Sequence, residues 1–224
     1  MDNFKIYTLV DHTLLAATAT WEGIVNLCDE AVKHGCASVC IPPSFVKQAK
    51  TAYPSLAICT VIGFPLGYNT TGAKLQEIAQ AISDGATELD VVINIGDAKA
   101  KNFDKITAEL TALKNAAGNN ILKVIIECCY LSEDEKIALC KSVTESGADY
   151  IKTSTGFGTG GATLEDIKLF KAHIGPNVKI KAAGGMRTRE DFIAFINEGC
   201  SRLGTSSAVK VLNQVQGGGS QGAY

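Results

Sequence analysis

The stretch Ser146-Gly-Ala-Asp-Tyr-Ile-Lys-Thr-Ser-Thr-Gly-Phe-Gly158 runs from a glycine suited to end a helix, through a short apolar segment, into a turn rich in glycine and hydroxyl groups. The first part of this pattern recurs, because His34-Gly-Cys-Ala37, Asp84-Gly-Ala-Thr87 and Glu198-Gly-Cys-Ser201 also come directly before strand-like segments. Glycine readily adopts the left-handed conformation found at many helix ends. The repetition therefore indicates one continuous array of alternating helices and strands.

Eight short apolar runs are predicted to be strands, at residues 6–10, 38–41, 57–62, 88–93, 122–126, 150–153, 178–182 and 202–204. Amphipathic segments predict helices at 20–33, 43–51, 73–83, 103–116, 132–145, 164–173, 189–198 and 206–215. Eight strand–helix units predict an α/β fold, a single-domain (β/α)8 TIM barrel over residues 1–216. An open, doubly wound sheet is the alternative architecture. Residues 217–224 are too rich in glycine to fold alone and are expected to form a flexible tail.

Composition narrows the class of protein. The chain has 224 residues, of which 46% are hydrophobic, which is enough for one sizeable core. A net charge of −2 argues against a nucleic-acid partner or an anionic membrane surface. The eight cysteines lack the spacing of metal-binding fingers, so we expect reduced thiols in a cytoplasmic protein and no structural metal. The N-terminus has no secretory signal pattern, and no apolar run approaches the ~20 residues needed to span a bilayer.

Two lysines are candidates for chemistry. Active residues of such barrels come from the C-terminal ends of strands. Side chains alternate across a strand, so Lys152 is expected to point into the barrel while Ile151 faces the helices. Lys181 is expected to do the same one strand later. An ordinary lysine, with a pKa of about 10.4, is protonated at pH 7, but a neighbouring positive charge and burial both favour the free amine. Lys152 beside Lys181 therefore suggests Schiff-base chemistry on a carbonyl compound.

Other inward residues leave alternatives open. Lys179 and Lys123 compete for the same interior but lie nearer the N-terminal ends of their strands. Asp90 sits within the apolar strand 88–93, where an unpaired carboxylate is costly. It is either a catalytic acid/base or a structural ion-pair partner of Lys123, Lys152 or Lys181.

Three glycine-containing turns are candidates for binding a phosphate group. They are Thr155-Gly-Phe-Gly158, Gly184-Gly-Met-Arg187 and Gly204-Thr-Ser-Ser207. Phosphate sites in these barrels commonly use the loops after strands seven and eight. Glycine lets an anion approach backbone N–H groups, and Ser206 and Ser207 add hydroxyl donors. We therefore expect Gly156, Gly184, Gly185, Arg187, Gly204, Ser206 and Ser207 to contact the phosphate.

The chain resembles the deoxyribose-phosphate aldolase family in segments spread over almost its whole length. These are Asp11-His-Thr-Leu-Leu15, Gly63-Phe-Pro-Leu-Gly67, Glu88-Leu-Asp-Val-Val-Ile-Asn94, Leu122-Lys-Val-Ile-Ile-Glu127, Ile151-Lys-Thr-Ser-Thr-Gly-Phe157 and Lys181-Ala-Ala-Gly-Gly-Met-Arg187. The resemblance implies a lyase that reversibly cleaves 2-deoxy-D-ribose 5-phosphate to D-glyceraldehyde 3-phosphate and acetaldehyde, without a metal or other cofactor. It also implies a place in deoxyribonucleotide catabolism and carbohydrate degradation.

The same resemblance assigns roles to single residues. Lys152 would form the Schiff base, Lys181 would favour its free amine and relay protons, and Asp90 would act as general acid/base through an ordered water. Asp11 and Thr13 match positions near the sugar hydroxyls. Cys40 matches a cysteine near the site, where its thiol could add to unsaturated aldehydes.

Two further positions bear on the resemblance. Phe157 stands where relatives carry lysine, so a charged phosphate contact is not expected there. Some family members end in a tyrosine that helps to protonate the enamine, so Tyr224 is a candidate for that role. A tail without a function is the alternative.

Two other functions would explain part of this sequence pattern. Another phosphate-binding barrel, such as a sugar-phosphate isomerase, would explain the glycine turns but leave the two lysines without a task. A non-catalytic sugar-phosphate sensor could share the fold, although it should lose the set of Lys152, Lys181 and Asp90. The expected partner is a small-molecule sugar phosphate, and a homodimer is kept open because the sequence does not fix the oligomeric state.

Overall fold

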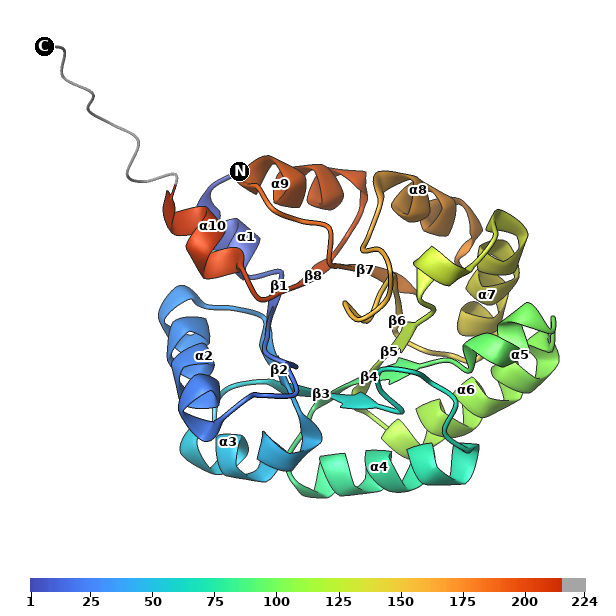
Figure 1. The fold of residues 1–224 in the computed structure, drawn as a ribbon, viewed down its shortest axis with the longest axis horizontal. Coiled ribbons are helices and arrows are strands. Elements are labelled where there is room, and N and C mark those ends of the chain that lie inside the picture. Colours follow the sequence, from blue (N-terminus) through green and yellow to red (C-terminus); the bar gives the residue numbers. More distant parts are fainter. Residues whose placement is uncertain (215–224) are drawn as a thin grey trace, which may run out of the picture.

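Eight parallel strands form a closed barrel in which each strand pairs with the next and β8 pairs with β1. The computed structural model describes residues 1–214. Figure 1 shows the ring of strands enclosed by helices. The strands are β1 (Val10–Thr13), β2 (Ser38–Ile41), β3 (Ile58–Ile62), β4 (Glu88–Val92), β5 (Ile121–Ile125), β6 (Tyr150–Lys152), β7 (Lys179–Ala183) and β8 (Arg202–Thr205). The predicted (β/α)8 barrel is confirmed, and the open doubly wound sheet is wrong.

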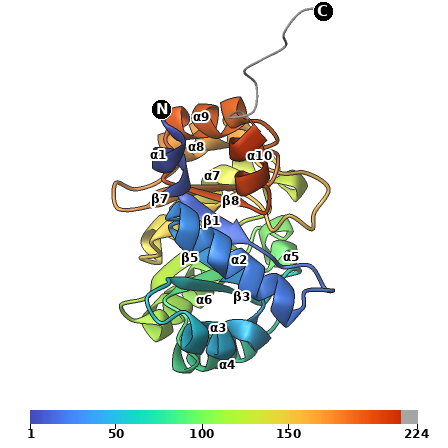
Figure 2. The ribbon, with the colours of Figure 1, turned by 90° about the vertical axis from the view of Figure 1, so that its left-hand side faces the viewer.

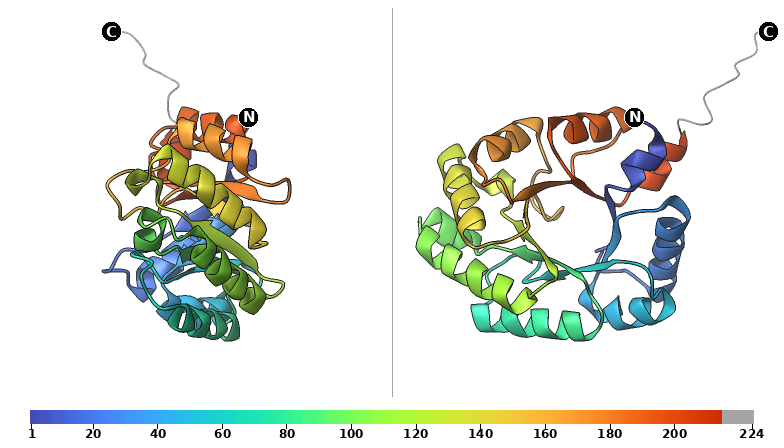
Figure 3. Two further views of the ribbon diagram at one scale, coloured as in Figure 1. Left: turned by 90° about the vertical axis from the view of Figure 1, so that its right-hand side faces the viewer. Right: turned by 180° about the vertical axis from the view of Figure 1, so that it is seen from behind.

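Helices cover the outside of the barrel on all sides, as the views in Figures 2 and 3 show. The α-helices are α1 (Asn3–Tyr7), α2 (Trp21–His34), α3 (Val46–Ala52), α4 (Thr71–Ser83), α5 (Ile95–Lys99), α6 (Phe103–Ala117), α7 (Glu133–Glu145), α8 (Leu164–His173), α9 (Arg189–Glu198) and α10 (Ala208–Gln214). Two 3₁₀ turns, η1 (Pro43–Phe45) and η2 (Cys128–Tyr130), complete the described elements.

The alternation of side chains along the strands separates an apolar shell from a charged interior. Ile151 and Ile180 belong to the hydrophobic core between the sheet and the helices. Their neighbours Lys152 and Lys181 point the other way, and they stand opposite each other in the register of β6 and β7. Asp90 is likewise fully buried inside the barrel between the apolar residues Leu89 and Val91. The expected inward direction of Lys152 is therefore confirmed.

The first strand is not where the hydrophobic pattern predicted it. Residues 3–7 form helix α1, whose start is capped by Asp2 accepting a hydrogen bond from the Lys5 amide. β1 follows at Val10–Thr13, so three polar residues, Asp11, His12 and Thr13, lie in a strand. They are tolerated there because the buried Asp11 carboxylate is paired with cations inside the barrel. Helix α5 and turn η2 were also not predicted, because each is only a single turn.

The first and last helices of the described residues are neighbours. Helices α1 and α10 lie side by side, and the Asn3 amide donates a 3.0 Å hydrogen bond to the Leu212 carbonyl (Figures 1 and 2). The predicted flexible tail 217–224, with Tyr224, lies outside the described residues.

Candidate active site

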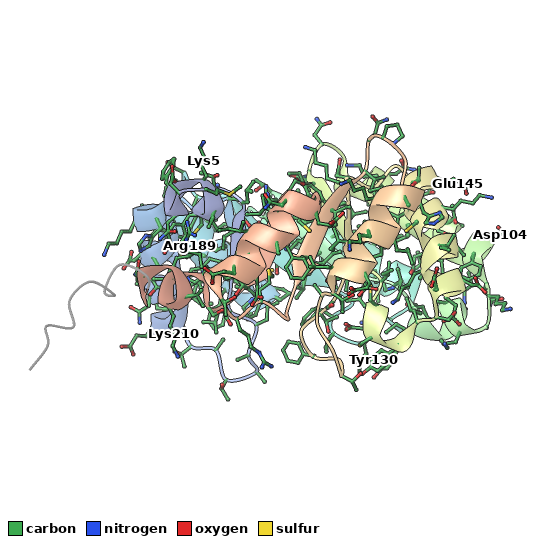
Figure 4. The ribbon with its side chains drawn as sticks, turned by 90° about the horizontal axis from the view of Figure 1, so that it is seen from above. Lys5, Asp104, Tyr130, Glu145, Arg189 and Lys210 are labelled. Carbon is green, nitrogen blue, oxygen red and sulfur yellow. The ribbon has the colours of Figure 1, made fainter. Side chains whose placement is uncertain are left out.

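A cavity of about 370 Å³ opens at the C-terminal ends of the strands. Thr13, Lys152, Ala183 and Thr205 line it, and each is the last residue of its strand. Figure 4 views the barrel from the side, with Tyr130, which follows β5, at the edge formed by the post-strand loops. Lys5 and Glu145, which precede strands, lie at the opposite edge. Gly204 of β8 also lines the cavity. The remaining lining comes from the loops after the strands: Leu14, Leu15, Ala16, Thr155, Gly156, Phe157, Gly184 and Ser206.

Lys152 and Lys181 share one carboxylate oxygen beneath this cavity. The Nζ atoms of both lysines lie 2.7 Å from Oδ2 of Asp90. Lys152 reaches the cavity, whereas Lys181 and Asp90 are completely buried. Burial opposes charge on Asp90, but Lys123, Lys152 and Lys181 hold the pKa of this carboxyl well below its usual range. The site therefore places an amine at the cavity floor, with a second lysine and a carboxylate in direct contact.

Asp11 secures Lys181 from the other side. Its Oδ2 lies 2.5 Å from the Lys181 Nζ, and its Oδ1 accepts hydrogen bonds from Ser38 and Arg202. Although burial works against both charges, Asp11 and Asp90 raise the pKa of Lys181, so this residue stays a cation. Asp11 is fully buried and does not line the cavity. Thr13, at the end of the same strand, does line it.

A third lysine lies in the barrel interior. The Lys123 Nζ is 2.7 Å from Glu88, 2.9 Å from Asp90 and 3.5 Å from Asp11. Arg202 completes this layer through paired hydrogen bonds of 2.8 and 2.9 Å to Glu88. Lys179, the other inward candidate, is exposed at the start of β7, where its Nζ lies 5.8 Å from the centre of the Tyr150 ring. Asp90 thus makes ion pairs with all three lysines named as its structural partners.

The glycine turns split into residues that line the cavity and residues that stand beside it. Gly156, Gly184, Gly204 and Ser206 belong to the lining, whereas Gly185, Arg187 and Ser207 do not. Gly185 has φ +77° and packs so closely that a Cβ would meet the Ala162 carbonyl oxygen at 2.7 Å, which explains why glycine is needed there.

Ser207 and Arg187 lie outside the lining and differ in their contacts. The Ser207 hydroxyl lies 3.0 Å from that of the lining residue Thr205. Arg187 is exposed, and its backbone N–H donates to Asp191.

Two thiols lie inside the barrel. Cys40 and Cys59 are register partners on β2 and β3, both fully buried, and Cys40 is not part of the cavity lining. Burial raises the pKa of Cys59 well above the ordinary value. With Asp90 these thiols form a cluster whose ligand atoms are close enough to share a metal ion. A cation there would have to displace the lysines that already occupy both carboxylate oxygens, so the cluster is poorly suited to metal binding.

Glu127 was not singled out from the sequence. It follows β5 with φ +56°, a conformation that few residues other than glycine adopt. Its buried carboxylate accepts hydrogen bonds from the backbone N–H and the hydroxyl of Thr155. Glu127 thereby holds the loop that carries Gly156 and Phe157 against the cavity. Its strained conformation leaves no signature in the sequence.

Phe157 forms part of the cavity mouth. Its side chain is 53% exposed and meets the Phe64 ring edge-on at a centroid distance of 5.3 Å. The lining residues Leu14, Leu15 and Ala16 were also missed, because the first strand was placed too early in the chain.

Among residues 1–214, no helix combines the length and apolar character needed to cross a bilayer. The sequence profile described as DeoC/LacD family aldolase matches residues 5–217. Deoxyribose-phosphate aldolase from Clostridium botulinum (strain Eklund 17B / Type B) is 62% identical over 213 residues, which cover 95% of this chain and 96% of that protein. The enzyme from Clostridioides difficile (strain 630) is 60% identical over 208 residues, covering 92% and 95%.

Solved structures of aldolases are also similar to this chain. The tetrameric deoxyribose phosphate aldolase from Aeropyrum pernix superposes with a TM-score of 0.89 at 30% identity, covering 96% of this chain and 92% of its own. The aldolase QR15 gives a TM-score of 0.90 at 35% identity, covering 95% and 96%. Sequence profile, full-length relatives and barrel geometry thus converge, and this chain belongs to the DeoC/LacD family of aldolases.

Proposed function

We propose that this aldolase reversibly cleaves 2-deoxy-D-ribose 5-phosphate to D-glyceraldehyde 3-phosphate and acetaldehyde. The observation that carries the proposal is Lys152, which lines the cavity while its Nζ touches a buried carboxylate shared with a second lysine. An amine so placed is suited to attack a carbonyl carbon. The relatives with 62% and 60% identity over nearly the whole chain are named for this substrate.

The reaction begins with the open-chain aldehyde of the sugar. The free amine of Lys152 attacks C1, and loss of water leaves a protonated imine on the lysine. This imine accepts the electron pair of the C2–C3 bond as that bond breaks, while the C3 hydroxyl loses its proton. Glyceraldehyde 3-phosphate departs, and the remaining enamine takes a proton at C2. Hydrolysis of the resulting imine releases acetaldehyde and regenerates the amine.

Asp90 and Lys181 supply the proton transfers in this scheme. A general base must lie within hydrogen-bond reach of the proton it moves, either directly or through one water. Because three lysines lower its pKa, the Asp90 carboxylate holds a proton only weakly. It is therefore suited to pass protons between the lysines, an ordered water and the substrate rather than to store them.

The distal phosphate is assigned to the turns that follow β7 and β8. Gly184, Gly204 and Ser206 line this part of the cavity. Gly185, Arg187 and Ser207 belong to the same segments and are assigned to shaping its edge or adding polar groups. Backbone N–H groups freed by glycine, together with the Ser206 hydroxyl, suit an anion. Fixing the phosphate there would hold C1 over Lys152, which removes much of the entropic barrier to attack.

Four residue assignments remain part of the proposal. Thr13, on the lining, is assigned to a sugar hydroxyl, and Asp11 acts on the substrate through Lys181. Cys40 is assigned to reaction with unsaturated aldehydes that reach the barrel interior. Tyr224, outside the described residues, is assigned to enamine protonation, so its deletion should slow exchange of the acetaldehyde α-protons and leave imine formation intact.

We also propose that the chain works in the cytoplasm as a homo-oligomer. All eight cysteines are free thiols, as is usual for proteins of a reducing compartment. The A. pernix relative is described as a tetramer, which supports self-association but does not choose between a dimer and a tetramer. Light scattering on the purified chain would give the assembled mass, and a monomer would contradict this part of the proposal.

A coupled assay tests the proposed reaction. Wild-type protein should release glyceraldehyde 3-phosphate and acetaldehyde in equal amounts from 2-deoxyribose 5-phosphate, and Lys152→Met should release neither. The matched control is Lys179→Met, which removes an exposed lysine from the opposite end of the barrel and should keep full activity. A wild-type protein that isomerises a sugar phosphate, or binds one without cleavage, would contradict the proposal.

A further inference from the structure

The barrel interior contains one connected network of ion pairs in which cations outnumber carboxylates. Three carboxylates take part: Asp11, Glu88 and Asp90. Four cationic side chains contact them: Lys123, Lys152, Lys181 and Arg202. All seven belong to strands, and each lies within 4 Å of an opposite charge in the network. With every member ionised, the interior therefore carries one surplus positive charge.

The surplus positive charge can be removed if one cationic side chain of the network loses a proton. Asp11 and Asp90 are held ionised, because nearby cations lower the pKa of each carboxyl despite burial. Carboxylates likewise raise the pKa of Lys123, of Lys181 and of Arg202 against the effect of burial. Within the described part of the chain, Lys152 makes a single ion pair, whereas Lys181 has two carboxylate partners and Lys123 has three.

We infer that Lys123, at the centre of this network, is a positioning residue that keeps Lys152 in its nucleophilic, uncharged form. Its Nζ is 2.7 Å from Glu88 and 2.9 Å from Asp90, so it neutralises carboxylate charge that would otherwise favour the Lys152 ammonium. Without Lys123, three cations would face three carboxylates, and the network would be neutral only with Lys152 protonated. The inference rests on the proposed function, because it assumes that Lys152 reacts as the free amine.

Three further titratable groups near the network, Cys59, Tyr150 and Glu127, do not alter this count. The Cys59 thiol lies 3.2 Å from both Asp90 and Lys123, and burial raises its pKa well above the ordinary value, so it stays neutral. Tyr150, on the strand of Lys152, lies beside the Arg202 guanidinium at 5.9 Å from ring centre to carbon. Glu127 belongs to the loop layer above and bonds to Thr155 rather than to any network cation.

Cys40 is a competing source of negative charge. A hydrogen bond with Cys59 lowers the pKa of the Cys40 thiol, and a thiolate there would cancel the surplus. Cys40→Ser separates the two alternatives, because it should leave the acidic limb of the pH dependence of kcat/KM unchanged if the thiol is neutral. A limb that moves to lower pH in Cys40→Ser would assign the fourth negative charge to the thiolate and overturn the count.

The pH dependence of kcat/KM, which reports ionisations of the free enzyme, tests the inference. Lys123→Met should move the acidic limb for 2-deoxyribose 5-phosphate cleavage upward by about 1–2 pH units, the size expected from losing one nearby charge. Activity should fall about 10–100-fold at pH 7 and recover at alkaline pH, where Lys152 loses its proton anyway. A merely structural role for Lys123 would lower the whole profile without moving the limb.

Two further variants test whether the acidic limb moves in the direction that the change in network charge predicts. Glu88→Gln removes a carboxylate, increases the surplus, and should move the limb to lower pH. The double variant Glu88→Gln/Lys123→Met restores a surplus of one and should return the limb towards its wild-type position. Glu88→Gln also keeps the test decisive if Lys123→Met does not fold, because an unmoved limb in that variant contradicts the charge count.

The matched control is Lys74, a fully buried lysine outside the barrel that pairs with Glu109 on α6 at 2.9 Å. Lys74→Met should lower stability and leave the limb in place. If wild type traps no imine at Lys152, the proposed function and this inference fail together. If the imine forms but the limbs of Lys123→Met and wild type coincide, or the double variant shifts as far as the single one, this inference alone fails.

Discussion

Lys152 and Lys181 are register partners on the neighbouring strands β6 and β7, and their amino groups meet at the same oxygen of Asp90, each at 2.7 Å. Two lysines this close favour loss of one proton, because like charges at short range are costly in a buried site. Lys181 has a second carboxylate, Asp11, at 2.5 Å, whereas Lys152 opens onto the cavity. This geometry supports the proposal that Lys152 is the nucleophile and Lys181 its charged neighbour.

Replacing Lys181 with leucine should impair the nucleophile without removing it. The loss of one positive charge favours the ammonium form of Lys152, so the acidic limb of the kcat/KM profile should move to higher pH. Activity at pH 7 should fall by roughly 10²-fold or more, the usual range for lost acid–base or activation effects. Steady-state kinetics between about pH 5 and 10 would measure this, and a limb that coincides with wild type would rule out an electrostatic role.

Asp90→Asn should abolish most turnover. The amide cannot take up the proton, and it leaves three lysines without a shared counter-charge. We expect kcat to fall by about 10²–10⁴-fold and the free energy of unfolding to drop by about 3–5 kcal/mol. Competition by inorganic phosphate, measured on the folded variant, should be little changed. Normal turnover in folded Asp90→Asn would leave a purely structural ion pair as the explanation.

The phosphate assignment predicts a selective effect of charge at Ser206. Ser206→Asp places a carboxylate on the cavity lining beside the glycine turns. Repulsion should raise the KM for 2-deoxyribose 5-phosphate by at least about tenfold. The KM for unphosphorylated 2-deoxyribose serves as the internal control and should change little. Equal increases for both sugars would mean that the phosphate binds elsewhere.

Acid stability should depend on Asp11. The folded-state pKa of its carboxyl is lowered below the ordinary value, although burial acts in the opposite direction, because Lys123, Lys181 and Arg202 surround it. A depressed folded pKa stabilises the native state above the unfolded value of about 3.9, and this contribution is lost as the pH falls below it. Urea unfolding at a series of pH values should therefore show the gap between wild type and Asp11→Asn narrowing below about pH 4. Parallel stability curves would contradict the assignment.

Structural features that depend on residues close together in the sequence could be predicted. Features that depend on contacts between distant strands could not. The bounds of β2, α8 and α9 follow from local features, namely β-branched runs, helix-starting hydroxyl groups and helix-ending glycines. The inward direction of Lys152 followed from simple alternation. By contrast, β1 was placed too early because Asp11 is stable in a strand only through cations on distant strands.

Of the ion-pair network, only the possible pairs of Asp90 with Lys123, Lys152 or Lys181 were predicted from the sequence. The contact of Arg202 with Glu88 joins β8 to β4, so it depends on the closed barrel and the strand register, which no local sequence pattern specifies. The same is true of Glu127, whose left-handed backbone and bonds to Thr155 appear only in the folded chain.

The most direct test of the whole account is to trap the imine. Protein incubated with 2-deoxyribose 5-phosphate or acetaldehyde and then reduced with borohydride should gain one covalent adduct per chain. A peptide map should place it on Lys152, and Lys152→Met should gain none. An adduct on Lys181 or Lys123, or no adduct in active wild-type protein, would contradict the central claim that Lys152 is the Schiff-base nucleophile.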